Sequence, residues 1–368
     1  MTGLKSRRRS AMPLLLPVIL SLHFLTAAPA GACSTLAFPD PEQPVLAFNF
    51  DFAETGAGFL IVNVEGIERR SVMDGNGARW SARYGSVTVN QVGPGMPTAG
   101  MNTAGLAITL MWNEAAIYGG STDAPTVSEL EFIQFLLDTS GSVEEALAKL
   151  ETVRIEGVVP IHYFLFDRTG AAAILTPAQN GLQVHTGDSL PVPALTNTSY
   201  AAAIEHIGKM QGFGGKVPMP EEQRPGETNS LDRFAIAAGL TGAAKTSFDP
   251  QSAFAALDRL ANRETRWQVV FEPQSQAMRL RLKGHAEDLV IDLGSQNFAC
   301  RGAPVGAALS TLTPDTLQDV LQPLEGSGLA ASLAEVLGSM SETAHLGQPE
   351  VARGLAAGLI AASSCTPE

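Results

Sequence analysis

A cysteine follows directly on what reads as a cleavable leader, and this position suggests a chemistry for its thiol. Basic residues near the start of the chain precede an apolar run from about Met12 to Leu25, and small residues then lead up to Ala32, immediately before Cys33. This order is typical of a secretory signal peptide with an A-x-A cleavage site. Cleavage after Ala32 would make Cys33 the first residue, with an α-amino group that could take the proton of its own thiol. We therefore predict residues 1–32 as a signal peptide and Cys33 as a nucleophile.

Two other interpretations of Cys33 stay open on the terminus alone. A lipoprotein anchor would acylate the same cysteine, although Ala30, three positions before it, is smaller than the aliphatic residue usual there. The third interpretation is an ordinary buried or disulfide-bonded cysteine. A blocked amine cannot act as a base, so lipid anchoring and catalysis exclude each other.

The cysteine count bears on the redox compartment. The chain contains three cysteines, Cys33, Cys300 and Cys365. In an oxidising compartment an odd number leaves one thiol unpaired. We expect Cys300 to pair with Cys365, which would tie the C-terminal tail to the body of the protein and leave Cys33 free.

Composition limits the function classes. The 368 residues are 45% hydrophobic and 17% charged, which is typical of a folded globular protein, and the net charge of −13 argues against nucleic-acid binding. Loss of the leader removes four positive charges and no negative ones, which takes the net charge to −17. No later stretch is long and apolar enough to span a bilayer. We expect a periplasmic or secreted protein without a transmembrane segment in the mature chain.

The elements that would position Cys33 follow from hydrophobic periodicity and turn residues. Strands are expected at 33–38, 45–52, 58–64, 86–92, 106–112, 161–166, 171–175, 182–185, 194–196, 267–272, 277–282 and 289–293. Helices are expected after the capping boxes Thr126/Glu129 and Ser142/Glu145, and at about 200–209, 231–240 and 251–260. Runs of strands between runs of helices predict an α+β fold, with two sheets between helix layers.

The domain organisation follows from the same pattern. Residues 33–297 are predicted to form one catalytic domain, and the Ala- and Leu-rich residues 298–368 a helical C-terminal extension. The longest loop is expected at 212–229, which is rich in Gly, Pro and Glu.

Other chemistries find no support in the sequence. The histidines are scattered without metal-ligand spacing, and His162, at the head of an apolar strand, is interpreted as a core or edge histidine. The glycine clusters lack the lysine of a phosphate-binding loop, and no G-x-S-x-G motif is present. We expect no metal and no cofactor.

Short segments in a fixed order identify a family. They are 33-CST-35, 49-NFD-51, 84-YGSVT-88, 100-GMNTAGL-106, 162-HYFLFD-167, 195-LTN-197 and 231-LDRF-234. In this order they resemble the choloylglycine hydrolase family of N-terminal-nucleophile (Ntn) hydrolases, which includes penicillin V acylases and bile salt hydrolases. The resemblance covers roughly residues 33–293. It implies a four-layer αββα fold and hydrolysis of a linear, non-peptide amide through an acyl-enzyme on Cys33.

The resemblance also implies roles for further residues. Asp51 would orient the α-amino group, Asn197 and the backbone N–H of Trp112 would hold the oxyanion, and Arg233 would stabilise charge. Each has an ordinary structural alternative: a turn aspartate, a helix-capping asparagine, a core tryptophan and a surface arginine paired with Asp232 or a nearby glutamate.

One position departs from the family pattern. The family places an arginine where this chain has Phe48, so one positive charge that would favour the thiolate is missing. Either Arg233 supplies this positive charge alone, or Asn49 compensates at the substrate and oxyanion site. We expect that Phe48→Arg would raise turnover. We expect an exported hydrolase of a small N-acyl amide, with homo-oligomers allowed. The alternative is a lipid-anchored or catalytically weak binding protein on the same fold.

Overall fold

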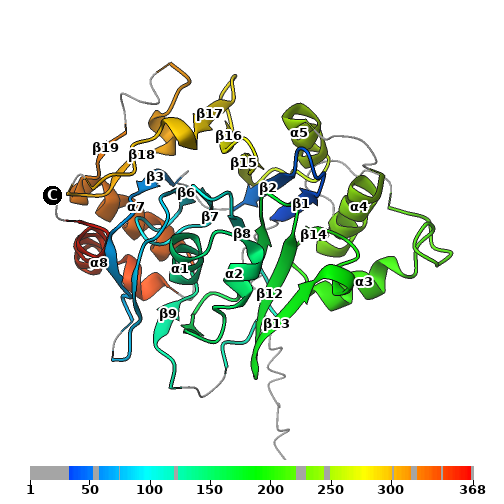
Figure 1. Ribbon diagram of the computed structural model, residues 1–368, viewed down its shortest axis with the longest axis horizontal. Helices are drawn as coiled ribbons and strands as arrows, with labels where there is room; N and C mark the ends of the chain where they lie inside the picture. Colours follow the sequence, from blue (N-terminus) through cyan, green and yellow to red (C-terminus); the bar gives the residue numbers. More distant parts are fainter. Residues whose placement is uncertain are drawn as a thin grey trace, which may run out of the picture.

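The computed structural model describes residues 33–52, 58–73, 75–119, 123–220, 229–243, 249–300, 302–315, 321–340 and 343–365. The predicted signal peptide and much of the predicted loop at 212–229 lie outside these residues. Two large antiparallel sheets face each other in the centre, and helices cover both outer faces (Figure 1). This arrangement confirms the α+β fold with four layers.

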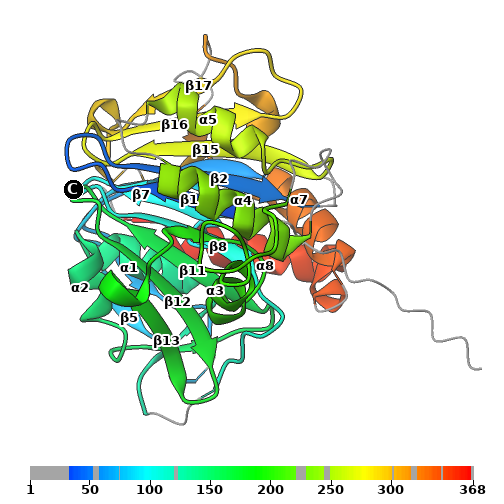
Figure 2. The ribbon, with the colours of Figure 1, turned by 90° about the vertical axis from the view of Figure 1, so that its right-hand side faces the viewer.

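The smaller of the two sheets carries Cys33 at its start. Its strands are ordered β14 (Ala194–Leu195), β1 (Ser34–Phe38), β2 (Val45–Asp51), β15 (Thr265–Glu272), β16 (Ala277–Leu282) and β17 (Leu289–Asp292). All residues of β1 and β2 are buried, because one face packs on the second sheet and the other on helices. Figure 2 shows β1, β2, β15 and β16 side by side above the strands of the second sheet.

The second sheet has nine strands. Their order is β13 (Gly181–Thr186), β12 (Ala172–Ala178), β11 (Ile161–Phe166), β8 (Ala107–Trp112), β7 (Ala99–Asn102), β6 (Ser86–Asn90), β3 (Phe59–Asn63), β18 (Val305–Ala308) and β19 (Gln322–Pro323). Two short pairs lie apart from it: β4 (Glu68–Arg70) with β5 (Arg79–Ser81), and β9 (Thr126–Ser128) with β10 (Arg154–Glu156). Side chains of both large sheets share one buried cluster, which is the centre of the core.

Helices form the outer layers. The six-stranded sheet is covered by α3 (Tyr200–Ile207), α4 (Ser230–Ala243) and α5 (Pro250–Asp258). The nine-stranded sheet is covered by α1 (Glu131–Thr139), α2 (Val143–Leu147), α7 (Gly326–Ser339) and α8 (Pro349–Ala362). In Figure 1, α7 and α8 lie on the opposite side of the molecule from α3 and α4. Among the described residues, no helix has the length and apolarity that crossing a bilayer would need.

The two predicted capping boxes have different outcomes. Ser142 caps α2 as predicted, with its side chain accepting the N–H of Glu145. The box before α1 is shifted by two residues: Ser128 Oγ accepts the N–H of Glu131, and Glu131 Oε2 accepts the N–H of Ser128. The prediction of Thr126/Glu129 is therefore wrong, because Thr126 belongs to a short strand and the helix begins later.

The C-terminal extension is more closely joined to the body than the sequence suggests. It begins with a strand rather than a helix, since β18 pairs with β3 inside the nine-stranded sheet. Two helices, α7 and α8, then follow as expected. The predicted disulfide between Cys300 and Cys365 is present, and it ties the end of α8 to the segment before β18.

Candidate active site

The hairpin of β1 and β2 places Cys33 beside the end of β2. Ser34 pairs with Asn49, so Cys33, one residue earlier, lies opposite Phe50 and beside Asp51, the last residue of β2. The Cys33 Sγ is 3.7 Å from the backbone oxygen of Asp51. Cys33 is the free cysteine of the described residues, and it is only 3% exposed.

Burial determines the protonation state of this thiol. It raises the pKa of Cys33 to about 12, and the nearby carboxyl group of Asp51 acts in the same direction, while Arg233 opposes them. At neutral pH the side chain is therefore a thiol, not a thiolate. A base in direct reach of the sulfur is needed before it can attack a carbonyl carbon.

Asp51 lies at the end of β2 with one carboxyl oxygen bound and one open. Its Oδ2 accepts a hydrogen bond from Asn262 Nδ2 at 2.9 Å, while its buried Oδ1 has no hydrogen-bond partner among the described residues. Burial raises the pKa of Asp51 to about 7, against hydrogen bonds from Thr265 and Asn262 and the charge of Arg233. The unpartnered oxygen can accept a further donor next to Cys33.

Arg233 brings a positive charge to the same place from the first turns of α4. Its guanidinium donates to Ser34 Oγ (3.3 Å) and to Asn197 Oδ1 (2.9 Å). The side chain is buried, and the desolvation that follows lowers its pKa, while Asp51 and Cys33 raise it. It is thus not a surface arginine paired with its neighbour in the chain.

The side chain of Asn197 lies against the backbone of Trp112. Asn197 Nδ2 donates to the backbone oxygen of Trp112 at 3.1 Å, while its Oδ1 is held by Arg233. The N–H of Asn113 donates to Pro160 O, on the β11 side of β8. Because successive residues of an antiparallel strand alternate, the N–H of Trp112 faces away from β11, on the side of the carbonyl that Asn197 binds. The two amide groups thus converge.

Asn49 lies outside this group, which corrects the expectation that it serves the substrate or the oxyanion. Its Nδ2 donates to Leu257 O at 2.9 Å, and its Oδ1 accepts from Gln268 Nε2 at 3.0 Å. The side chain is fully buried and ties β2 to α5 and β15. Alternation along β2 turns it to the helix layer, away from the sulfur.

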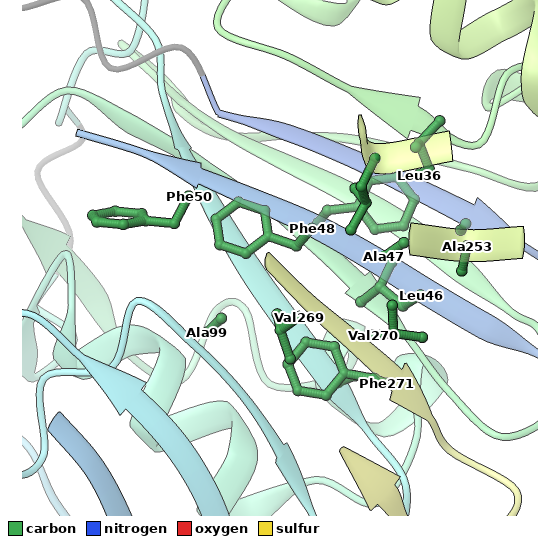
Figure 3. Close-up of a cluster of buried hydrophobic side chains, with 14 of the residues drawn as sticks. Leu36, Leu46, Ala47, Phe48, Phe50, Ala99, Ala253, Val269, Val270 and Phe271 are labelled. Atoms are coloured by element: carbon green, nitrogen blue, oxygen red, sulfur yellow. The ribbon is translucent and has the colours of Figure 1, made fainter. Parts of the chain in front are cut away.

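Phe48 lies in the core between the sheets. It is fully buried, and its ring packs edge-on against Trp267, with the ring centroids 5.5 Å apart. Figure 3 shows it between apolar side chains of β2 and β15, including Phe50 and Val269. The surrounding cluster is mostly apolar, and the hydroxyl of its cross-strand neighbour Thr35 is already hydrogen-bonded to Thr109 at 2.9 Å.

Two residues at the site were not predicted from the sequence. Asn262, in the turn before β15, holds Asp51. His162 joins the segments of the two converging amides: its Nε2 binds Thr196 O at 2.8 Å, and its Nδ1 binds Asn113 Nδ2 at 3.2 Å. Burial lowers the pKa of His162 to about 4, so it is neutral at pH 7. Asn262 belongs to none of the segments that identified the family, and His162 opens the segment 162-HYFLFD-167 but was interpreted only as a core or edge histidine.

A cavity of about 370 Å³ opens in front of Cys33. Cys33, Asp51 and Trp112 line one part of it, and mostly apolar side chains line the rest. Its volume is in the range of small-molecule sites. The arrangement is a buried thiol with a carboxyl group beside it, two amide groups and a mostly apolar cavity.

Comparisons with known proteins agree with this geometry. The profile of the linear amide C–N hydrolases, choloylglycine hydrolase family, matches residues 33–257. The fold is similar to that of penicillin V acylase from Agrobacterium tumefaciens, with TM-score 0.65 and 22% identity over 80% of this chain and 98% of that one. It is also similar to a mutant of conjugated bile acid hydrolase from Clostridium perfringens, with TM-score 0.59 and 16% identity over 72% of this chain and 94% of that one. No curated protein sequence matches significantly.

Proposed function

Because the chain belongs to the linear amide C–N hydrolases of the choloylglycine hydrolase family, and is thus a hydrolase of linear amides, we propose that it works through an acyl-enzyme on Cys33. The substrate would be a small N-acylated molecule. The observation that carries this proposal is the buried Cys33 thiol, which lines a mostly apolar cavity with Asp51 at its side.

The base in this proposal is the α-amino group of Cys33, freed by removal of residues 1–32. A thiol with a pKa of about 12 stays protonated at neutral pH and needs a proton acceptor close by. An α-amino group, with an ordinary pKa of about 7.7–8.0, is partly unprotonated near neutral pH and belongs to the same residue, so it can accept the proton as the sulfur attacks. The open Oδ1 of Asp51 supports the assignment, since it can accept a hydrogen bond from that amine.

The reaction then follows in two halves. The sulfur attacks the amide carbon and its proton passes to the amine; the tetrahedral oxyanion forms beside Asn197 and the Trp112 N–H. The C–N bond breaks, and the leaving amine takes the proton. Water, deprotonated by the same α-amine, attacks the thioester carbon; the C–S bond breaks, the acid is released, and the amine returns the proton to the sulfur. Preorganised donors of this kind stabilise the developing charge without reorganisation.

Arg233 supports both halves electrostatically. It fixes Asn197 through Oδ1, which leaves the Nδ2 hydrogens of that amide for Trp112 O and for the oxyanion. Its buried charge also favours the anionic states of the sulfur and of the intermediate.

We further propose that the protein is exported. The order of basic, apolar and small residues before Cys33 supports this, and so does the disulfide between Cys300 and Cys365, because disulfides persist in oxidising compartments. An acylated N-terminus would instead indicate the lipid-anchored binding protein.

Hydrolysis of a panel of N-acyl amides by wild type, Cys33→Ala and Cys33→Ser tests this function. We expect amide cleavage by the wild type and its loss, by about 10⁴-fold or more, in Cys33→Ala. Thermal melting of the variants controls for folding. Cleavage that persists in folded Cys33→Ala would contradict the proposal.

A further inference from the structure

The cavity in front of Cys33 reaches the last two helices of the chain. Leu333 and Leu337 of α7 and Leu355 and Leu359 of α8 belong to its lining. These helices lie on the outer face of the nine-stranded sheet and beyond the residues that the family profile matches. One wall of the site is therefore built by the C-terminal extension.

The C-terminal end of this helix pair is held by a disulfide and by hydrogen bonds. The disulfide between Cys300 and Cys365 closes directly after α8, and the N–H of Cys365 donates to Gly302 O at 2.8 Å. Ser363 Oγ accepts a hydrogen bond from the buried Arg69 at 3.2 Å. With covalent and polar attachments at one end and apolar packing along its length, the helix pair can act as a fixed boundary.

The lining has no group that would pair with a charge on the acyl part of a substrate. Among its described residues there is no Lys, Arg or His, and its acids are Asp51, beside the nucleophile, and Glu129. Glu129 Oε1 accepts the N–H groups of Val158 and Val159, so it is engaged by the backbone. A carboxylate at the far end of an acyl group would lose its hydration without finding a partner.

The apolar surface continues to the outside. Val72 and Val158 line the cavity and are 46% and 61% exposed, so part of its apolar lining is open to solvent. Resting on the proposed function, we propose that the acyl group of the substrate is a long, straight aliphatic chain. It lies between Cys33 and the α7–α8 pair, and this pair limits the chain length that the enzyme accepts.

A homologous series of straight-chain N-acyl amides with one fluorogenic amine tests the proposal. Each methylene that becomes buried should raise kcat/KM by roughly threefold to fourfold, up to the length at which the chain meets the helices. Phenoxyacetyl amides and amides with a distal carboxylate should be poorer substrates than the long alkanoyl amide. Equal or faster cleavage of either would overturn the proposal.

Two helical glycines provide a matched pair of variants. Gly358 of α8 lines the cavity and Gly328 of α7 does not, and a Cβ at either position meets nothing within 4 Å. Leucine also favours a helix more than glycine does, so neither change should unfold the protein. Gly358→Leu should lower the ratio of long-chain to short-chain kcat/KM by about tenfold or more, and Gly328→Leu should leave the ratio unchanged. An unchanged ratio in Gly358→Leu would contradict the role of the helix pair.

Binding measurements distinguish a failure of the acyl-chain proposal from a failure of the proposed function. Calorimetry with Cys33→Ala and straight-chain fatty acids should show affinity that increases with chain length and is weakened by an added Gly358→Leu. If amides are cleaved through Cys33 without preference for long chains, the acyl-chain proposal fails and the function stands. If no amide is cleaved but fatty acids bind as described, the function fails and the assignment of the pocket stands.

Discussion

At the scale of single residues, the site contains two buried acidic groups, the Cys33 thiol and the Asp51 carboxyl group, and the pKa of each is raised. Burial raises the pKa of the Cys33 thiol to about 12 and that of Asp51 to about 7. Both shifts disfavour charge, and Arg233 offsets them only in part. A thiol in such surroundings is protonated at neutral pH. In the mechanism that we propose, it loses its proton in the same step in which it attacks, and an amine on the same residue is well placed to accept that proton.

Asp51→Asn should separate activity from stability. Loss of the carboxylate is expected to lower kcat/KM by about 10²-fold or more, because the amine is no longer oriented. In the wild type, activity should fall as the pH drops below about 7 and Asp51 takes up a proton.

Asp51 should affect stability and activity in opposite directions as the pH rises: activity increases and the stability contribution decreases. Its pKa is raised from 3.8 to about 7 in the folded chain, so between these values the folded state binds more protons than the unfolded state. The contribution of Asp51 to the free energy of unfolding therefore decreases as the pH rises through this window. Urea unfolding should show that Asp51→Asn gains stability relative to wild type between pH 4 and pH 8. A constant difference would contradict the raised pKa.

Phe48→Arg should destabilise the protein rather than activate it. The sequence alone suggested a gain in turnover, but Phe48 is fully buried between the sheets against Trp267. A guanidinium there would lack solvent and a partner, and we expect a loss of more than about 3 kcal/mol in the free energy of unfolding. Phe52→Arg is the control, because Phe52 is only half-buried. Equal stability of the two variants, or faster turnover in Phe48→Arg, would restore the original hypothesis.

At the scale of elements, the site depends on the ends of strands from both sheets. Cys33 and Asp51 come from β1 and β2, Trp112 from β8, and Asn197 from the residues after β14. His162 of β11 connects the last two by binding Thr196 O and Asn113. We predict that it is a positioning residue, which would act on the two amides through their neighbours.

His162→Leu should lower kcat by about tenfold or more, up to the 10²–10³ that loss of an oxyanion donor costs. Because the pKa of His162 is lowered to about 4, the residue is neutral throughout the working range, and the shape of the pH profile should not change. His285→Leu, at an exposed position, is the control. If His162→Leu instead shifts the pH profile, the histidine takes part in proton transfer.

Element prediction succeeded where residues repeat with a clear period. The long apolar strands β2, β8 and β11 and the helices α3 to α5 were expected close to their observed bounds. β7, with the sequence AGMN, and β18, with VGAA, were missed because small residues carry no strand signal. β18 is a strand because it pairs with β3, which is distant in sequence, and β7 is a strand because it lies between its neighbours β6 and β8 in the sheet.

The leader and the family segments pointed to Cys33, Asp51, Trp112, Asn197 and Arg233. The structure brings these residues together, and their catalytic roles stay a prediction. The contacts of Asn262 and His162 could not be foreseen, since they join residues 211 and 34 positions apart. Asn49 was misassigned because the sequence does not show which face of β2 is on the side of the Cys33 sulfur.

At the scale of the whole molecule, the C-terminal extension closes the catalytic domain. β18 adds a strand to the nine-stranded sheet, α7 and α8 cover its outer face, and the disulfide holds their end. The same residues thus stabilise the fold and shape the cavity.

Removal of the disulfide in Cys300→Ser/Cys365→Ser should lower the free energy of unfolding by about 2–5 kcal/mol, because the bond closes a loop of 65 residues. Urea unfolding measures this loss, and a reducing agent should destabilise the wild type but not the double variant. Equal stability of the two proteins would show that packing alone holds α7 and α8.

The most direct measurement is mass spectrometry of the N-terminal peptide after rapid acid quenching of enzyme with an excess of amide substrate. The account predicts a peptide that begins at Cys33, with a free amine and with the mass of one acyl group on its sulfur. A peptide that begins elsewhere, an acylated amine, or active enzyme that never carries an acyl group on Cys33 would contradict it.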